Sequence, residues 1–164
     1  MSDERIQLLQ AMPIFGAIDR TILEFLLERV SQVSAEKGGL FFREGSSGGS
    51  AFVLEEGRVS ILKRWNGRDY VLGQLETGDC FGEVALLDLG PRSASVVAET
   101  HCTALELTAA DLFEVSKRNL EQFAIIYMNL GRELSRRLRV ADARLFLAKQ
   151  QVNPFAEEYT FNLG

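Results

Sequence analysis

The sequence predicts an α+β fold that is mainly β, with an antiparallel β barrel or sandwich between helices at the two ends of the chain. Apolar residues recur at helical spacing before about residue 32 and again from residue 121. Residues 38–107 instead contain short apolar runs separated by Gly, Ser and Asp clusters. With 164 residues and 46% hydrophobic composition, the chain is long enough for one well-buried core.

The first 32 residues predict two short helices. Apolar residues from Ile6 to Val30 follow helical spacing, and Pro13 and Gly16 interrupt the pattern between the two helices. The N-terminal segment is charged, and no window of the chain approaches the ~20 apolar residues that span a bilayer. We therefore expect a cytoplasmic chain that makes no membrane contact.

The middle of the chain, from Gly38 to Leu107, predicts the strands of the barrel. Runs such as AFVL, VSIL and SASVVAE have strand length and composition. The clearest local pattern is SILKRWNGRDYVL, in which Asn66 and Gly67 tolerate positive φ between two strand-like runs. We expect a tight hairpin at this position.

After the strands, the sequence returns to helix. Thr108 is suited to an N-cap with Asp111 at position N3. A long helix is expected over about residues 121–148, with a tail at 149–164 in which Pro154 closes the helix. The helix carries an apolar stripe of about seven turns. The stripe consists of Phe123, Ile126, Leu130, Leu134, Leu138, Ala141, Leu145 and Ala148. Because such a helix outruns one small barrel, we expect it to form a homodimer. The alternative is that the whole stripe packs on its own barrel.

Composition argues against several classes of function. The 18 basic and 23 acidic residues give a net charge of -5, so the chain has no overall positive field for nucleic acid, and we expect no direct nucleic-acid partner. Cys80 and Cys102 lack paired spacing, which predicts buried free thiols in place of a disulfide or zinc site. His101 is the only histidine, so neither a cupin-like metal site nor a Ser/His/Asp arrangement can be assembled. We expect no metal and no catalysis.

Residues 81–96, FGEVALLDLGPRSASV, carry the candidate site. EVALLDLG has the length and composition of a two-turn helix ended by Gly90. Gly82 allows a ligand to approach the backbone closely, and the free N–H groups of Glu83, Val84 and Ala85 form the positive end of this short helix. An anion is expected there.

Arg92 and Glu83 suit two different parts of one ligand. Arg92 follows Pro91, and its guanidinium fork matches a phosphate, with the Ser93 hydroxyl beside it. A carboxylate at Glu83 repels a phosphate but is a strong acceptor for a hydroxyl such as that of a ribose. The pair therefore favours a sugar phosphate, and a cyclic diester fits because its single charge needs one arginine. The alternative is a surface ion pair around a structural turn.

The same stretch resembles the phosphate-binding cassette of the cyclic nucleotide-binding domain family, which includes catabolite activators, kinase regulatory subunits and nucleotide-gated channels. Further segments that resemble the family are LLQAMPIFGAIDRTILEFLLERV, FFREGSSGGSAFVLEEGRVSIL and GQLETGDCFGE. The resemblance runs from about residue 5 to 148. It implies a domain of residues 1–148 with an antiparallel double-stranded β-helix, or jelly-roll barrel, over about 38–107.

The resemblance also implies roles for the candidate residues. Glu83 would bind the ribose 2'-hydroxyl, while Arg92, Ser93 and the backbone N–H groups of residues 82–85 would hold the cyclic phosphate. Ile61 and Leu72 lie where the family lines its pocket with apolar side chains, although aliphatic residues in strands are expected in the core in any case.

The sequence departs from the family pattern in two places. Gly48 and Gly49 replace the family's Gly-Asp turn, and Ala141 and Asp142 stand where catabolite activators offer Thr-Ser to the adenine amino group. Asp142 either accepts hydrogen bonds from adenine or guanine or is a solvated helix residue. Cyclic AMP is favoured over cyclic GMP as the ligand.

Together these features predict a small-molecule sensor that binds a cyclic mononucleotide and transmits the signal through its C-terminal helix to an unknown downstream protein. The sequence ends at Gly164, so we expect either a domain that stands alone, without a helix-turn-helix after the long helix, or a fragment of a larger regulator. The alternatives are a degenerate domain that only dimerises and a haem or redox sensor with the same fold.

Overall fold

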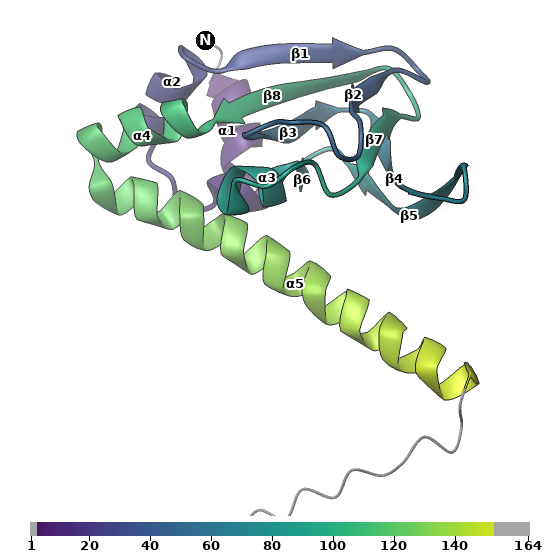
Figure 1. The fold of residues 1–164 in the computed structure, drawn as a ribbon. Coiled ribbons are helices and arrows are strands. Elements are labelled where there is room, and N and C mark those ends of the chain that lie inside the picture. The colour runs from purple at the N-terminus through teal and green to yellow at the C-terminus, as the bar shows by residue number, and fades with distance from the viewer. Residues whose placement is uncertain (1–2, 153–164) are drawn as a thin grey trace, which may run out of the picture. The chain divides into compact units, whose positions relative to one another are not determined.

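The computed structural model describes residues 3–152, and the chain divides into two units, Met1–Leu130 and Gly131–Gly164. Figure 1 shows the order of the elements, with helices before and after the strands. All eight strands lie in the first unit, and the last helix runs from the first unit into the second. The predicted arrangement of strands between helices is confirmed.

Two short helices open the described chain, as predicted. They are α1 (Asp3–Gln10) and α2 (Arg20–Leu27), and a 3-10 turn, η1 (Pro13–Phe15), lies between them. Proline occupies the first position of η1, where its missing N–H costs no hydrogen bond. The buried faces of these elements include Ile6, Phe15 and Leu23. Pro13 therefore separates the helices without disturbing the core.

The strands form two four-stranded antiparallel sheets. They are β1 (Ser31–Ala35), β2 (Leu40–Phe42), β3 (Ser50–Glu56), β4 (Arg58–Trp65), β5 (Arg68–Glu76), β6 (Cys80–Phe81), β7 (Ser95–Ala98) and β8 (Cys102–Thr108). The first sheet has the order β1-β8-β3-β6 and the second β2-β7-β4-β5. The mainly β, jelly-roll class is confirmed, but the two sheets do not close into a barrel.

The first sheet is buried on both faces. Phe52, Leu54 and Ala104 pack between the two sheets, while the alternate residues Val53 and Leu105 pack against the helices. A strand that is covered on both sides needs apolar residues at successive positions. This explains the unbroken apolar run AFVL in β3.

The strands begin earlier than the predicted start at about residue 38. β1 pairs along its length with β8, from Ser31 opposite Glu106 to Ala35 opposite Cys102. Its sequence, SQVSA, has only Val33 as a large apolar residue, and none of its residues is fully buried. Because it is an edge strand held by backbone pairing, it carries little of the hydrophobic pattern on which sequence analysis depends.

The hairpin predicted at Asn66 and Gly67 is confirmed. β4 and β5 are joined by these two residues, whose φ angles are 47° and 75°, and Trp65 pairs with Arg68 across the turn. Positive φ at both central positions matches the right-handed twist of the strands. β5 is the edge strand of the second sheet.

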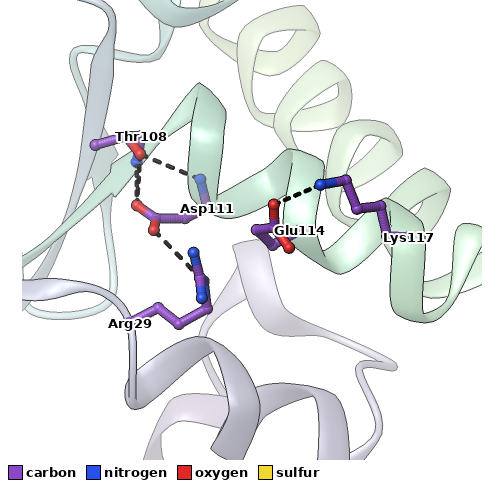
Figure 2. Close-up of polar contacts among 5 residues, drawn as sticks. All are labelled: Arg29, Thr108, Asp111, Glu114 and Lys117. Carbon is purple, nitrogen blue, oxygen red and sulfur yellow. Dashed lines mark hydrogen bonds and ion pairs between the residues drawn. The ribbon is translucent and has the colours of Figure 1, made fainter.

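The predicted N-cap of the helix that follows the strands is also confirmed. Thr108 precedes α4 (Ala109–Arg118), and its side chain and that of Asp111 satisfy each other's backbone N–H groups in a capping box. Figure 2 shows this pair, together with Arg29, which reaches Asp111 from the end of α2 at 3.9 Å. The cap therefore also connects α4 to the N-terminal helices.

The long helix, α5 (Leu120–Val152), extends beyond the predicted range of 121–148. In the first unit, Ile126 and Leu130 are fully buried, and Asn129 donates to the backbone carbonyls of Ile14 and Gly16. In the second unit, Leu138 and Leu145 are exposed. The predicted stripe therefore contributes to the core only in its first part. Pro154 lies outside the described residues.

The described residues contain no helix that is both long and apolar enough to cross a membrane. Both cysteines are buried free thiols, as predicted from their spacing.

Candidate functional site

The candidate site is built around α3 (Glu83–Asp88), the short helix between β6 and β7. Gly82 precedes it with φ +76°, a left-handed conformation that glycine adopts without strain. The helix ends at Asp88, and the left-handed residue that caps it is the largely exposed Leu89 and not the predicted Gly90. The N–H of Gly90 instead donates a hydrogen bond to the side chain of Asp88. α3 is therefore one residue shorter than its glycine pattern suggested.

Arg92 lies on the segment between α3 and β7, and its side chain is turned into the protein. It is 5% exposed. Nη1 donates to the backbone carbonyls of Ser50 and Gly82, the second at 3.0 Å, and Nη2 donates to Ser50 Oγ at 3.0 Å. The guanidinium thus joins the N-terminal end of α3 to the first residue of β3.

Aromatic rings surround this guanidinium. Its central carbon lies 4.1 Å from the ring centre of Phe42 and 5.6 Å from that of Phe52, within cation–π range. Phe52 in turn stacks on Phe81, with ring centres 5.3 Å apart, and Phe41 meets Phe81 edge to face. The rings hold the charged group in a fixed plane and exclude water from it.

Two glycines make room for the guanidinium, because neither has a Cβ atom. A Cβ atom at Gly48 would lie 2.5 Å from Arg92 Nε, and one at Gly82 would lie 2.7 Å from Nη1. Any larger side chain at either position would displace the arginine. The family-like glycine at position 48 therefore has a direct steric role here.

Burial and two carboxylates act in opposite directions on Arg92. Burial lowers the pKa of its guanidinium, while the negative charges of Glu106 and Glu83 favour the charged form. Among the described residues, Nε is the buried side-chain nitrogen that has no hydrogen-bond partner. A guanidinium with an unused N–H in a nearly dry environment is a strong candidate to receive an anion.

The loop that carries Arg92 is fixed by backbone and lysine contacts. The Arg92 N–H donates to Ser46 O at 2.9 Å, and the Gly45 N–H donates to Arg92 O at 2.8 Å. The Ser93 carbonyl accepts from Lys63 Nζ at 2.8 Å. Lys63 is also paired with Glu44 at 2.6 Å, which lowers the pKa of that carboxyl group. Ser93 itself is an exposed residue.

The structure brings several predicted residues together within the first unit. Glu83, Val84 and Ala85 form the first turn of α3, directly after Gly82, whose carbonyl accepts from Arg92. Glu83 is 3% exposed, so it is not the side chain of a surface ion pair, which was the alternative interpretation.

The remaining predicted residues lie elsewhere. Ile61 packs against the buried cluster between the sheets, opposite Val96. Leu72 is 51% exposed, contrary to the expectation that a strand aliphatic would be core, because β5 is an edge strand whose first five residues are exposed on both faces. Asp142 is an exposed residue of α5 in the second unit.

Sequence analysis missed Ser50 and Glu106. Ser50 Oγ donates to Glu106 Oε1 at 2.7 Å while it accepts from Arg92. The only sequence signal was a polar residue beside the apolar residues of each strand, which is too common to identify a site. Within residues 3–152, no cluster of three His, Cys, Asp or Glu side chains could hold a metal ion.

The fold defines the chain as a helix-covered antiparallel sandwich of the jelly-roll class, with a buried arginine next to a short helix. Comparison with known proteins makes this more specific. The sequence model of the cyclic nucleotide-binding domain matches residues 32–119, more than half of the chain. The chain therefore belongs to the cyclic nucleotide-binding domain family.

Individual relatives agree with this assignment. The chain is 31% identical over 109 residues to the human potassium/sodium hyperpolarization-activated cyclic nucleotide-gated channel 2, covering 66% of this chain and 12% of the channel. It is 29% identical over 140 residues to the cyclic AMP receptor protein of Thermus thermophilus, covering 85% and 63%. The crystal structure of the Thermus thermophilus catabolite activator protein superposes with a TM-score of 0.73 at 30% identity, covering 84% and 63%. The chain spans less than two thirds of each of these proteins.

Proposed function

We propose that this chain is a sensor domain, formed by about residues 1–148, that binds a cyclic mononucleotide at Arg92 and Glu83. The observation that carries the proposal is the contact between Arg92 and Gly82, which brings the buried guanidinium to the first turn of α3. This arrangement lies within the segment that matches the family. A positive side chain and a row of backbone N–H groups then meet at one point, as phosphate recognition requires.

In this proposal, the two charged residues bind different parts of the ligand. Arg92, Ser93 and the N–H groups of residues 82–85 hold the cyclic phosphate, and the Glu83 carboxylate accepts a hydrogen bond from the ribose 2'-hydroxyl. Glu83 is buried, so a hydroxyl that reaches it would meet an acceptor with little competition from water. Ile61 and Leu72 would supply apolar contacts, and the half-exposed position of Leu72 leaves surface for a ligand to cover.

We favour cyclic AMP as the nucleotide. The name of the Thermus thermophilus relative, cyclic AMP receptor protein, supports this choice, as does the 85% of the present chain that the alignment covers. Cyclic GMP is the alternative nucleotide. The ligand thus remains within one chemical class in either case.

Isothermal titration calorimetry with cyclic AMP, cyclic GMP and a cyclic dinucleotide tests the proposal. We expect saturable binding of one cyclic mononucleotide per chain, tightest for cyclic AMP, and no binding of the dinucleotide, which carries a second phosphate that the single arginine does not match. Folded protein that gives no binding heat with either mononucleotide at several temperatures would contradict the proposed function.

We also propose that α5 forms a homodimer and transmits the signal. In the second unit, Leu134, Leu138, Ala141, Leu145 and Ala148 are spaced alternately by four and three residues, the pattern of a coiled-coil seam. Leu138 and Leu145 are 61% and 55% exposed, so they present apolar surface that a second copy would cover. Asn129 and Gln122 connect the start of α5 to the loop between η1 and α2. A ligand that shifts this part of the domain would bias the dimer.

Leu138→Lys should weaken dimerisation strongly, because it places a charge at the centre of the seam. Leu147→Lys is the matched control, since Leu147 is equally exposed at 59% and lies about half a turn away around the helix. Sedimentation velocity, with and without saturating cyclic AMP, measures both effects. If α5 transmits the signal, the nucleotide changes the dimerisation constant of the unaltered protein. Equal behaviour of the two variants, or a constant that cyclic AMP leaves unchanged, would count against this role.

A further inference from the structure

A chain of hydrogen bonds leads from Arg92 into the first sheet. Arg92 Nη2 donates to Ser50 Oγ at 3.0 Å, and the same hydroxyl donates its hydrogen to Glu106 Oε1 at 2.7 Å. We refer to Arg92, Ser50 and Glu106 as the arginine relay. Because a hydroxyl can accept and donate at once, the relay connects a cation to a carboxylate through one side chain.

The strands fix the inner part of the relay. Ser50 begins β3 and Glu106 lies on β8, and the two strands pair in register, with Ser50 opposite Thr108 and Phe52 opposite Glu106. Arg92 lies on the segment between α3 and β7, outside both strands. The relay therefore anchors the side chain of a loop residue to a rigid ladder of two paired strands.

The guanidinium is already well supplied with acceptors inside the protein. Nη1 is shared between the carbonyls of Ser50 and Gly82, Nη2 is bonded to Ser50 Oγ, and Phe42 covers one face of the group. Arg92 and Ser50 are 5% and 6% exposed. Nε has no partner, but a phosphate that is to be held by the Nη donors as well must replace some of these contacts.

Charge acts in the same direction. The carboxylate of Glu106 favours the charged form of Arg92 more than that of Glu83 does, which is seen in its larger effect on the pKa of the guanidinium. Glu106 thus offsets part of the cost of burying this positive charge, although burial still lowers the pKa of the guanidinium. A phosphate brought to Arg92 must approach the negative charge of Glu106 as well.

We propose that Glu106, acting through Ser50, is a positioning residue that holds Arg92 against β3 and thereby weakens the binding of the nucleotide phosphate. The inference rests on the proposed function, because it concerns the affinity of the same site. Loss of the Glu106 charge should have two opposite effects: the fold becomes less stable, since a buried cation loses its counter-charge, and cyclic nucleotide binding becomes tighter. If Glu106 had a purely structural role, its loss would lower both the stability of the fold and the affinity for the nucleotide.

Glu106→Gln tests the inference, because it removes the charge and keeps an oxygen that can accept from Ser50. Glu99→Gln is the matched control, since Glu99 accepts a hydrogen bond from Ser60 Oγ on a neighbouring strand in the same way but does not take part in the relay. Thermal melting and calorimetric titration with cyclic AMP and with cyclic GMP are measured on both variants. We expect both variants to melt at lower temperature, with Kd lowered roughly three- to tenfold in Glu106→Gln and unchanged within about twofold in Glu99→Gln.

Ser50→Ala provides a second arm that leaves every charge in place. It breaks the relay at its centre, so it should also tighten binding, and it replaces Glu106→Gln if that variant does not fold. Binding by the unaltered protein, with affinity in Glu106→Gln or Ser50→Ala equal to or weaker than wild type, would overturn the inference alone. Absence of binding by the unaltered protein would overturn the proposed function and this inference together.

Discussion

Arg92→Ala is expected to weaken cyclic nucleotide binding by about 2 to 3 kcal/mol or more, which corresponds to roughly 30- to 150-fold in Kd. The variant removes the charged partner of the phosphate from a site where burial strengthens electrostatic interactions. It also leaves the carbonyls of Ser50 and Gly82 without their donor, so melting temperature should fall. Calorimetric titration with cyclic AMP, on samples first shown to be folded by circular dichroism, measures the loss.

Two further variants separate charge from geometry in this result. Arg92→Lys keeps the positive charge but loses the fork of donors, so it should recover only part of the affinity. Arg20→Ala removes the same charge from an exposed ion pair with Asp3 at the surface and should leave Kd unchanged. A folded Arg92→Ala protein that binds cyclic AMP within about threefold of the unaltered protein would mean that the phosphate is held elsewhere.

The sequence contains enough information to predict the elements whose signals are local. The hairpin at Asn66 and Gly67 and the capping box of Thr108 and Asp111 each depend on residues at most three positions apart, and both are present in the structure. The cassette around α3 is similarly compact, so its glycine, glutamate and arginine could be recognised as a set. Local chemistry of this kind does not depend on how distant strands pair.

The features that sequence analysis missed depend on distant pairing. Ser50 lies 42 residues before Arg92, and Glu106 comes close to both only because β3 pairs with β8. β1 was missed because its stability comes from the ladder with β8 and not from its own apolar residues. Leu72 and its neighbour Val71 are both exposed because they lie on the uncovered part of the edge strand β5. Each of these features depends on the order and pairing of the strands, which a single sequence specifies weakly.

The buried orientation of Arg92 also changes how the cassette should be interpreted. An arginine recognised from a motif is easily pictured as pointing towards solvent, ready for the ligand. Here it is covered by Phe42 and bonded to Ser50 and Gly82, so its affinity for a phosphate is a difference between two sets of contacts. Residues that never touch the ligand, such as Glu106, then contribute to that difference.

Glu83 is expected to account for recognition of the ribose, and a cycle of protein and ligand changes isolates this contribution. The unaltered protein should bind cyclic AMP more tightly than 2'-deoxy cyclic AMP by about 1.5 to 3 kcal/mol, or roughly 10- to 150-fold, because a hydroxyl bonded to a buried carboxylate is lost. In Glu83→Ala this preference should nearly disappear, since neither nucleotide then finds the acceptor. Calorimetry with each of the two proteins and each of the two nucleotides gives the coupling energy between Glu83 and the 2'-hydroxyl directly.

The affinity of Glu83→Ala for 2'-deoxy cyclic AMP gives a stricter test of this role. Glu83 favours the charged form of Arg92 and repels a phosphate bound beside it, so Glu83→Ala should bind 2'-deoxy cyclic AMP no more weakly than the unaltered protein does. Asp88→Ala is the control, because Asp88 is an exposed carboxylate on the same helix, bonded to the N–H of Gly90. It should keep the full preference for cyclic AMP. If Glu83→Ala retains that preference as well, the 2'-hydroxyl is bound by another group, and the role proposed for Glu83 is wrong.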